Sequence, residues 1–103
     1  MSFVANDVLK DEVLRYLGYS TDCDENIKKN VDGFIEDAVY RLDEIAGAEV
    51  DYDKDRHART LLKDYCRYLN SHAIEYFEEN FKSQLGSLHW IYRVKEVQGN
   101  EEN

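Results

Sequence analysis

Histidine, cysteine and acidic side chains are the groups in this sequence that could catalyse a reaction or bind a metal ion. His57, His72 and His89 are scattered, and none lies in an HExxH motif or beside a cysteine at ligand spacing. On one predicted helix His57 and His72 would lie roughly 22 Å apart, at about 1.5 Å per residue, so they cannot bind the same ligand. We therefore interpret the histidines as polar surface or interface residues rather than catalytic ones.

The cysteines and the acidic runs also have structural explanations. Cys23 and Cys66 are far apart without CxxC spacing, which favours reduced structural thiols over a disulfide or a metal site. The acidic runs at 21–25 and 51–55 lack the spaced ligands, central glycine and terminal glutamate of an EF-hand calcium loop. Helix capping and favourable charge at helix N-termini explain both runs more simply than adventitious cation binding.

Motifs and composition exclude several functional classes. The sequence contains no P-loop, GxGxxG or GxSxG motif, so we expect no catalytic, cofactor-binding or metal-binding residue and no enzymatic activity. A formal net charge of −9 argues against binding to a phosphate backbone or to an anionic membrane. There is no apolar run of 18 residues and no basic-then-apolar signal sequence, so we expect the chain in the cytoplasm.

The fold class follows from apolar spacing. With 103 residues and 43% hydrophobic residues, the chain is expected to form one globular domain. From Arg56 to Phe81 apolar residues recur at steps of three and four, and neither proline nor glycine interrupts them. We predict an all-α, single-domain bundle of about four helices, organised around one long helix at about 54–79. Its inward stripe comprises Ala58, Leu61, Leu62, Tyr65, Cys66, Leu69, Ala73, Ile74 and Phe77.

Three further helices are predicted at about 7–17, 24–46 and 81–94. Gly18 and Gly47 can end the first two, because glycine adopts the left-handed conformation common after a helix. Asn80 could end the long helix in the same way, and Gly33 would mark a close helix crossing. The predicted domain covers residues 1–97, and residues 98–103 are expected to form a flexible acidic tail.

The aromatic residues carry the strongest indication of function. Eight tyrosines, four phenylalanines and one tryptophan are many for a small helical domain. Core packing is the simpler interpretation, and Tyr65 and Phe77 fit the inward stripe. Four others in the second half flank a stripe, and surplus aromatic surface is typical of a protein–protein interface. These flanking residues are Tyr68, Tyr76, Trp90 and Tyr92.

Nearly the whole chain resembles a known family. A short helix (DEVLRYLGY) precedes an acid-led helix (DENIKKNVDGFIEDAVYRL) and then ARTLLKDYCRYLNSHAIEYFEENFKSQLGSLH. This order resembles the small head–tail connector proteins of tailed bacteriophages and of prophages in Gram-positive bacteria. The most specific part runs from Ala58 to His89, with its Tyr65–Tyr68 segment and the Phe77–Phe81 segment that closes it.

The resemblance implies a structural virion protein, a helical adaptor without enzymatic activity. Such proteins dock as a ring, usually of about twelve copies, on the portal vertex of a filled head. The implied partners are the portal protein and a downstream connector or tail-completion protein, and the implied location is the virion neck after assembly in the bacterial cytoplasm. DNA would pass through without specific binding, because an acidic lumen repels it.

An acidic regulator is the alternative function. A helical protein with a net charge of −9 could bind and inhibit a basic host or phage protein, by imitating the charge of DNA. Its acidic residues alternate with basic ones on the predicted helix faces, as on an ordinary solvated surface. That alternation favours the connector over the regulator.

Overall fold

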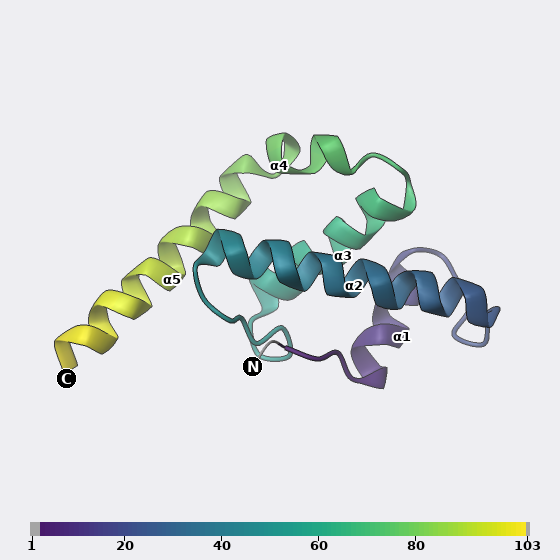
Figure 1. The fold of residues 1–103 in the computed structure, drawn as a ribbon, viewed down its shortest axis with the longest axis horizontal. Helices are drawn as coiled ribbons and strands as arrows, with labels where there is room; N and C mark the ends of the chain where they lie inside the picture. Colours follow the sequence, from purple (N-terminus) through teal and green to yellow (C-terminus); the bar gives the residue numbers. More distant parts are fainter. Residues whose placement is uncertain (1–2, 103) are drawn as a thin grey trace.

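The computed structural model describes residues 3–102, with side chains described through Gln98. Within this range the regular elements are all helical, so the predicted all-α class is confirmed (Figure 1). In chain order they are α1 (Asp7–Tyr16), α2 (Glu25–Ala46), α3 (Arg56–Asn70), a 3-10 turn (Ile74–Tyr76), α4 (Phe77–Asn80) and α5 (Lys82–Glu102). None of the described helices is long and apolar enough to cross a bilayer.

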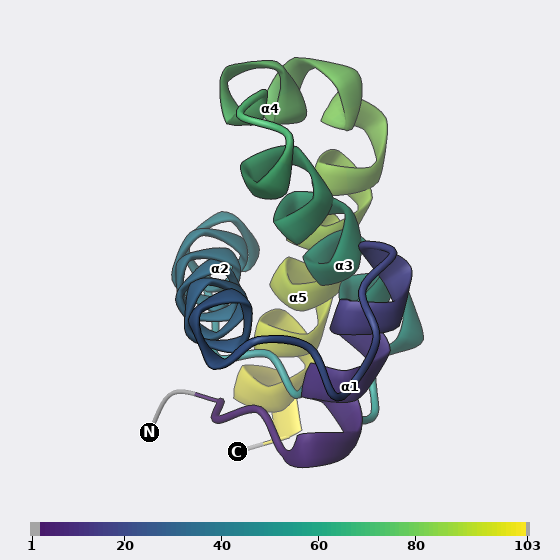
Figure 2. The same ribbon diagram turned by 90° about the vertical axis from the view of Figure 1, so that its right-hand side faces the viewer.

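The bundle is organised around α2, which packs against α1, α3 and α5 (Figures 1 and 2). The helix begins where the Asp24 carboxylate accepts a hydrogen bond from Asn26 N at 2.7 Å. It ends at Gly47, which adopts the left-handed conformation with a φ of 74°. One face of α2 is buried, and its residues recur at helical spacing: Val31, Ile35, Ala38, Val39, Leu42 and Ala46.

The prediction of one long helix at 54–79 is wrong, because α3 ends at Asn70. His72 adopts the left-handed conformation with a φ of 56°. Its N–H donates to Leu69 O at 3.1 Å, and Ala73 N–H donates to Tyr68 O at 2.9 Å. These two bonds form a Schellman motif, which ends a helix by satisfying carbonyls of its last turn.

The chain turns back after this break and closes one end of the bundle. The 3-10 turn and α4 lie above α3 and lead directly into α5 (Figure 2). Asn80 is the last residue of α4, but the left-handed conformation predicted for it is wrong. Its side-chain Nδ2 instead donates to Tyr68 Oη at 3.0 Å, across the turn.

The last helix, α5, is longer than the predicted 81–94. Its backbone stays helical through Glu102, so most of the expected tail at 98–103 continues the helix, and position 103 lies outside the described residues. Leu85 and Leu88 are buried against the bundle and Tyr92 is half-buried. The C-terminal part of α5 projects from the body of the molecule, as Figure 1 shows.

One hydrophobic core lies between the helices, and the 47–55 loop contributes to it. Val50 and Tyr52 from that loop are buried together with the inner faces of the helices. A Cβ built at Gly33 would meet nothing within 4 Å, so the close crossing expected there does not occur within this chain.

Candidate functional site

The three histidines lie on separate elements and do not form a site. His57 Nε2 lies 3.2 Å from Gln84 O, and His89 Nδ1 lies 2.9 Å from Ile45 O. These contacts connect α5 to α3 and to α2, while His72 occupies the break after α3. Among the described residues, no three His, Cys, Asp or Glu side chains are placed to hold a metal ion.

Both cysteines are free thiols in the structure, as the sequence predicts. Cys66 is fully buried on α3, and Cys23 is half-buried in the connection between α1 and α2. Burial raises the pKa of the Cys66 thiol to about 12, because the charged thiolate is poorly solvated there. At neutral pH Cys66 is therefore a protonated core residue and a poor nucleophile.

The two acidic runs contain helix caps. Asp24 caps α2, and the Asp55 carboxylate accepts a hydrogen bond from Ala58 N at 3.0 Å at the start of α3. Asp51 accepts a hydrogen bond from Asp53 N at 3.0 Å within the second run. Capping as a role of both acidic runs is therefore confirmed, but the capping residues are Asp24 and Asp55, which the sequence alone did not single out.

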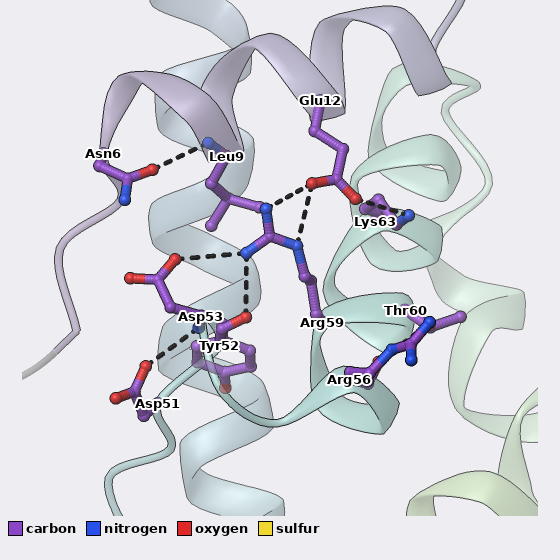
Figure 3. A network of polar contacts seen from close by, with 10 residues as sticks. All are labelled: Asn6, Leu9, Glu12, Asp51, Tyr52, Asp53, Arg56, Arg59, Thr60 and Lys63. Atoms are coloured by element: carbon purple, nitrogen blue, oxygen red, sulfur yellow. Dashed lines mark hydrogen bonds and ion pairs between the residues drawn. The ribbon is translucent and has the colours of Figure 1, made fainter.

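Arg59 is the centre of the largest polar network (Figure 3). Its guanidinium donates to Glu12 on α1, to Tyr52 O at 3.1 Å and to Asp53 at 3.2 Å. Lys63 Nζ lies 3.0 Å from the other Glu12 oxygen. The hydrogen bonds from Arg59 are the main reason why the pKa of Glu12 falls to about 2. Glu12 is thus a fixed anion that holds α1 to α3, which makes it unsuited to accept a proton in catalysis.

Tyrosine–aspartate hydrogen bonds join other parts of the chain. The pairs within residues 3–102 are Tyr16 with Asp64, Tyr52 with Asp43 at 2.8 Å, and Tyr92 with Asp55 at 2.7 Å. Tyr52 is fully buried, and burial raises the pKa of Asp43 although Tyr52 and Val50 N donate to it. Because each pair spans two elements, we interpret these bonds as structural links.

Four aromatic residues of the second half pack in the core cluster: Tyr65 and Phe77, as predicted, together with Phe81 and Tyr68. The expectation that Tyr68 belongs to the surplus aromatic surface is wrong, because its ring packs edge-on against Phe77 and Phe81. Phe77 is fully buried, and its ring centroid lies 4.9 Å from Tyr65, 5.5 Å from Tyr68 and 4.8 Å from Phe81. This cluster attaches the 3-10 turn and α4 to α3. Edge-to-face and offset contacts of this kind stabilise a core beyond the burial of area alone.

Other aromatic residues face solvent and form the candidate site. Tyr40 on α2, Tyr76 in the 3-10 turn and Trp90 on α5 are 73%, 58% and 65% exposed. Tyr76 and Trp90 match the surplus identified from the sequence, whereas Tyr40 was missed. Its signal was its position opposite the buried stripe of α2. The expectation for Tyr92 is wrong, because it is half-buried and packs against the core. Large exposed aromatic side chains are typical anchors of protein–protein interfaces.

A hollow of about 270 Å³ lies beside Tyr76, at the point where the chain breaks after α3. The guanidinium of Arg67 lies 4.9 Å from the ring centroid of Tyr68 at its edge. The lining consists of Arg67, Tyr68, Ser71, Ala73, Tyr76 and Asn80. The hollow is shallow and open, which suits a partner's side chain better than an enclosed small molecule.

Comparisons with protein-family models, with curated proteins and with solved structures give no match to this chain.

Proposed function

We propose that this protein is a structural head–tail connector without enzymatic activity, which joins the head of a tailed bacteriophage to its tail. In this function it docks as a ring on the portal vertex, extends the DNA channel and presents a surface to the next connector or tail-completion protein. It would be located in the virion neck, after assembly in the bacterial cytoplasm. The resemblance of residues 58–89 to connector sequences motivates the proposal.

The observation that carries the proposal is the distribution of exposed aromatic residues. An adaptor must bind at least two neighbours at once, so it needs separate interaction surfaces. Tyr40, Tyr76 and Trp90 expose most of their side chains on three different elements. These positions can anchor contacts with a neighbouring protein of the virion neck and with neighbouring copies of the chain.

The charge of the chain is compatible with a DNA channel. Phosphate binding would require clustered Lys and Arg, whereas the formal net charge is −9. Basic side chains such as Arg41, Arg59 and Lys63 are already paired with acidic residues. A ring of such subunits would repel DNA and let it slide through.

Deletion of the gene in the phage or prophage that encodes it tests this function. We expect electron microscopy to show tailless heads that have lost their DNA, beside free tails. Complementation with the intact gene should restore tailed particles. Normal tailed particles from the deletion strain would reject the connector and favour an acidic regulator that binds a basic protein.

A pair of point variants makes the same experiment more specific. Tyr76→Ser removes the aromatic ring beside the hollow, and Val8→Ser removes a side chain that is 68% exposed on α1. We expect Tyr76→Ser to restore fewer tailed particles than Val8→Ser. Equal complementation by both would exclude the hollow as a docking point.

A further inference from the structure

The two longest helices expose faces with the same spacing. On α5, Gly86, Trp90, Arg93 and Val97 follow one another at steps of four, three and four. This set, the α5 outer face, lies opposite the buried Leu85 and Leu88, and Trp90 and Val97 are 65% and 44% exposed. A projecting helix with an exposed apolar stripe is a surface that another helix can cover.

The matching face of α2 has the same arrangement. Gly33, Asp37, Tyr40 and Glu44, the α2 outer face, have steps of four, three and four. Their helix buries its opposite side in the core, and Tyr40 is 73% exposed. α2 and α5 contact each other through their inner faces, so these outer faces cannot meet within one chain.

The glycines of the two faces have no packing role within the chain. A Cβ added at Gly33 or at Gly86 would meet nothing within 4 Å. Glycine inside a helix costs about 1 kcal/mol relative to alanine, and here no neighbouring element of the same chain approaches. Close approach by an external helix would give both glycines a function.

The charges of the two faces are complementary. From Lys82 to Lys95, α5 carries basic residues and no acidic one, in a chain whose net charge is −9. Arg93 on α5 and Asp37 on α2 are exposed, and neither forms an ion pair with the side chains described between residues 3 and 98. Two α5 outer faces placed together would instead bring like charges close.

We propose that the α5 outer face of one copy packs antiparallel against the α2 outer face of the next copy. In this register Arg93 meets Asp37, Trp90 meets Tyr40, and each glycine faces the far end of the partner's stripe. The contact is heterologous, so its repetition generates a ring or an open filament. The inference rests on the proposed function, because a connector acts as a ring. It identifies the two surfaces whose contact would close that ring.

Sedimentation of the purified full chain across the micromolar to millimolar range tests the contact. We expect concentration-dependent association, weakened at least about tenfold by Trp90→Ala or Arg93→Asp. Val8→Ala and Arg15→Asp change exposed residues of α1 and should leave association unchanged. Arg93→Asp chains and Asp37→Arg chains should each associate weakly alone, whereas mixing them should restore association, because every contact between the two kinds of chain joins opposite charges. The double variant, which carries both changes, should also recover association.

Gly86→Ala separates close packing from folding. Because the added Cβ meets nothing in its own chain, this variant should melt at a higher temperature, yet associate more weakly. A chain that stays monomeric at every concentration would overturn the proposal. Association that depends on Arg93 but not on Asp37 would overturn it too, since it would indicate contact between two α5 helices.

The two proposals can fail separately. If the purified chain associates through these faces but the deletion strain still makes normal tailed particles, the connector function is rejected and the contact is kept. Tailless particles from the deletion strain, together with a purified chain that never associates, would keep the connector and reject the contact.

Discussion

At the residue scale, the ion pair between Arg59 and Glu12 makes the stability of the fold depend on pH. The carboxylate of Glu12 bridges two cations, Arg59 and Lys63, and its pKa falls from 4.5 to about 2. A carboxyl group whose pKa is lower in the folded state stabilises the fold above its unfolded pKa. That stabilisation is lost as the pH falls from about 4.5 towards 2.

Replacing Glu12 by glutamine should remove this pH-dependent contribution. We expect Glu12→Gln to lower the free energy of unfolding at neutral pH by about 1–2 kcal/mol, since partial exposure screens the pair. The difference from the wild-type chain should shrink between pH 4.5 and 2, which urea denaturation at several pH values measures. A difference that stays constant over this range would show that the charge of Glu12 does not stabilise the fold.

At the element scale, the break after α3 depends on one exposed residue in a left-handed conformation. His72 has a φ of 56°, which costs a residue with a Cβ about 1 kcal/mol or more. Glycine occupies the equivalent position after α1, where Gly18 has a φ of 90° and completes the same motif.

This comparison predicts opposite effects of two substitutions. His72→Gly should stabilise the fold by about 0.5–1 kcal/mol, while His72→Val should destabilise it, because a β-branched residue is strained at positive φ. Denaturant midpoints measure both, and Gly18→Ala, expected to destabilise the fold, is the matched control. Stabilisation by His72→Val would mean that α3 can continue through position 72 into a longer helix.

The signals at the helix ends explain which elements could be predicted from the sequence. The start of α1 is signalled by Asn6, and the ends of α1 and α2 by Gly18 and Gly47. The end of α3 has no such signal, because apolar periodicity continues through it and His72 is an unusual left-handed residue. The break allows Phe77 to pack against Tyr65 of α3, a tertiary contact that local periodicity does not reveal.

The candidate surfaces could be predicted only in part. The positions of Tyr76 and Trp90 beside the apolar stripes predict their exposure. The same argument fails for Tyr68 and Tyr92, which tertiary contacts half-bury. The hollow next to Tyr76 could not be predicted, because it exists only where the chain turns back after α3. Tyr40 was missed since it occupies one solvent-facing position in a long, regular helix and breaks no local pattern.

At the scale of the whole molecule, excess negative charge opposes compaction. The chain has 22 acidic and 13 basic side chains. Several acidic residues, among them Glu36 and Asp37, form no ion pair with the side chains described from residue 3 to residue 98. Moderate salt screens exposed charges over about 10 Å but acts less on partly buried pairs such as Arg59–Glu12.

Salt should therefore weaken the repulsion between acidic residues more than the attraction within ion pairs, and so stabilise the fold. We expect the melting temperature to rise by on the order of a few degrees between low and physiological ionic strength. Circular dichroism melts in sodium chloride measure this, at protein concentrations low enough to keep the chain monomeric. A falling melting temperature would show that the ion pairs dominate the electrostatics of the fold.

The buried Cys66 can report how often the helical bundle opens transiently. Its thiol is shielded by the core and is protonated at neutral pH, so an alkylating reagent can reach it only in transiently open molecules. The half-buried Cys23 provides an internal reference for the reagent. The ratio of the two labelling rates would follow how often the bundle opens, in the free chain and in any assembly that contains it.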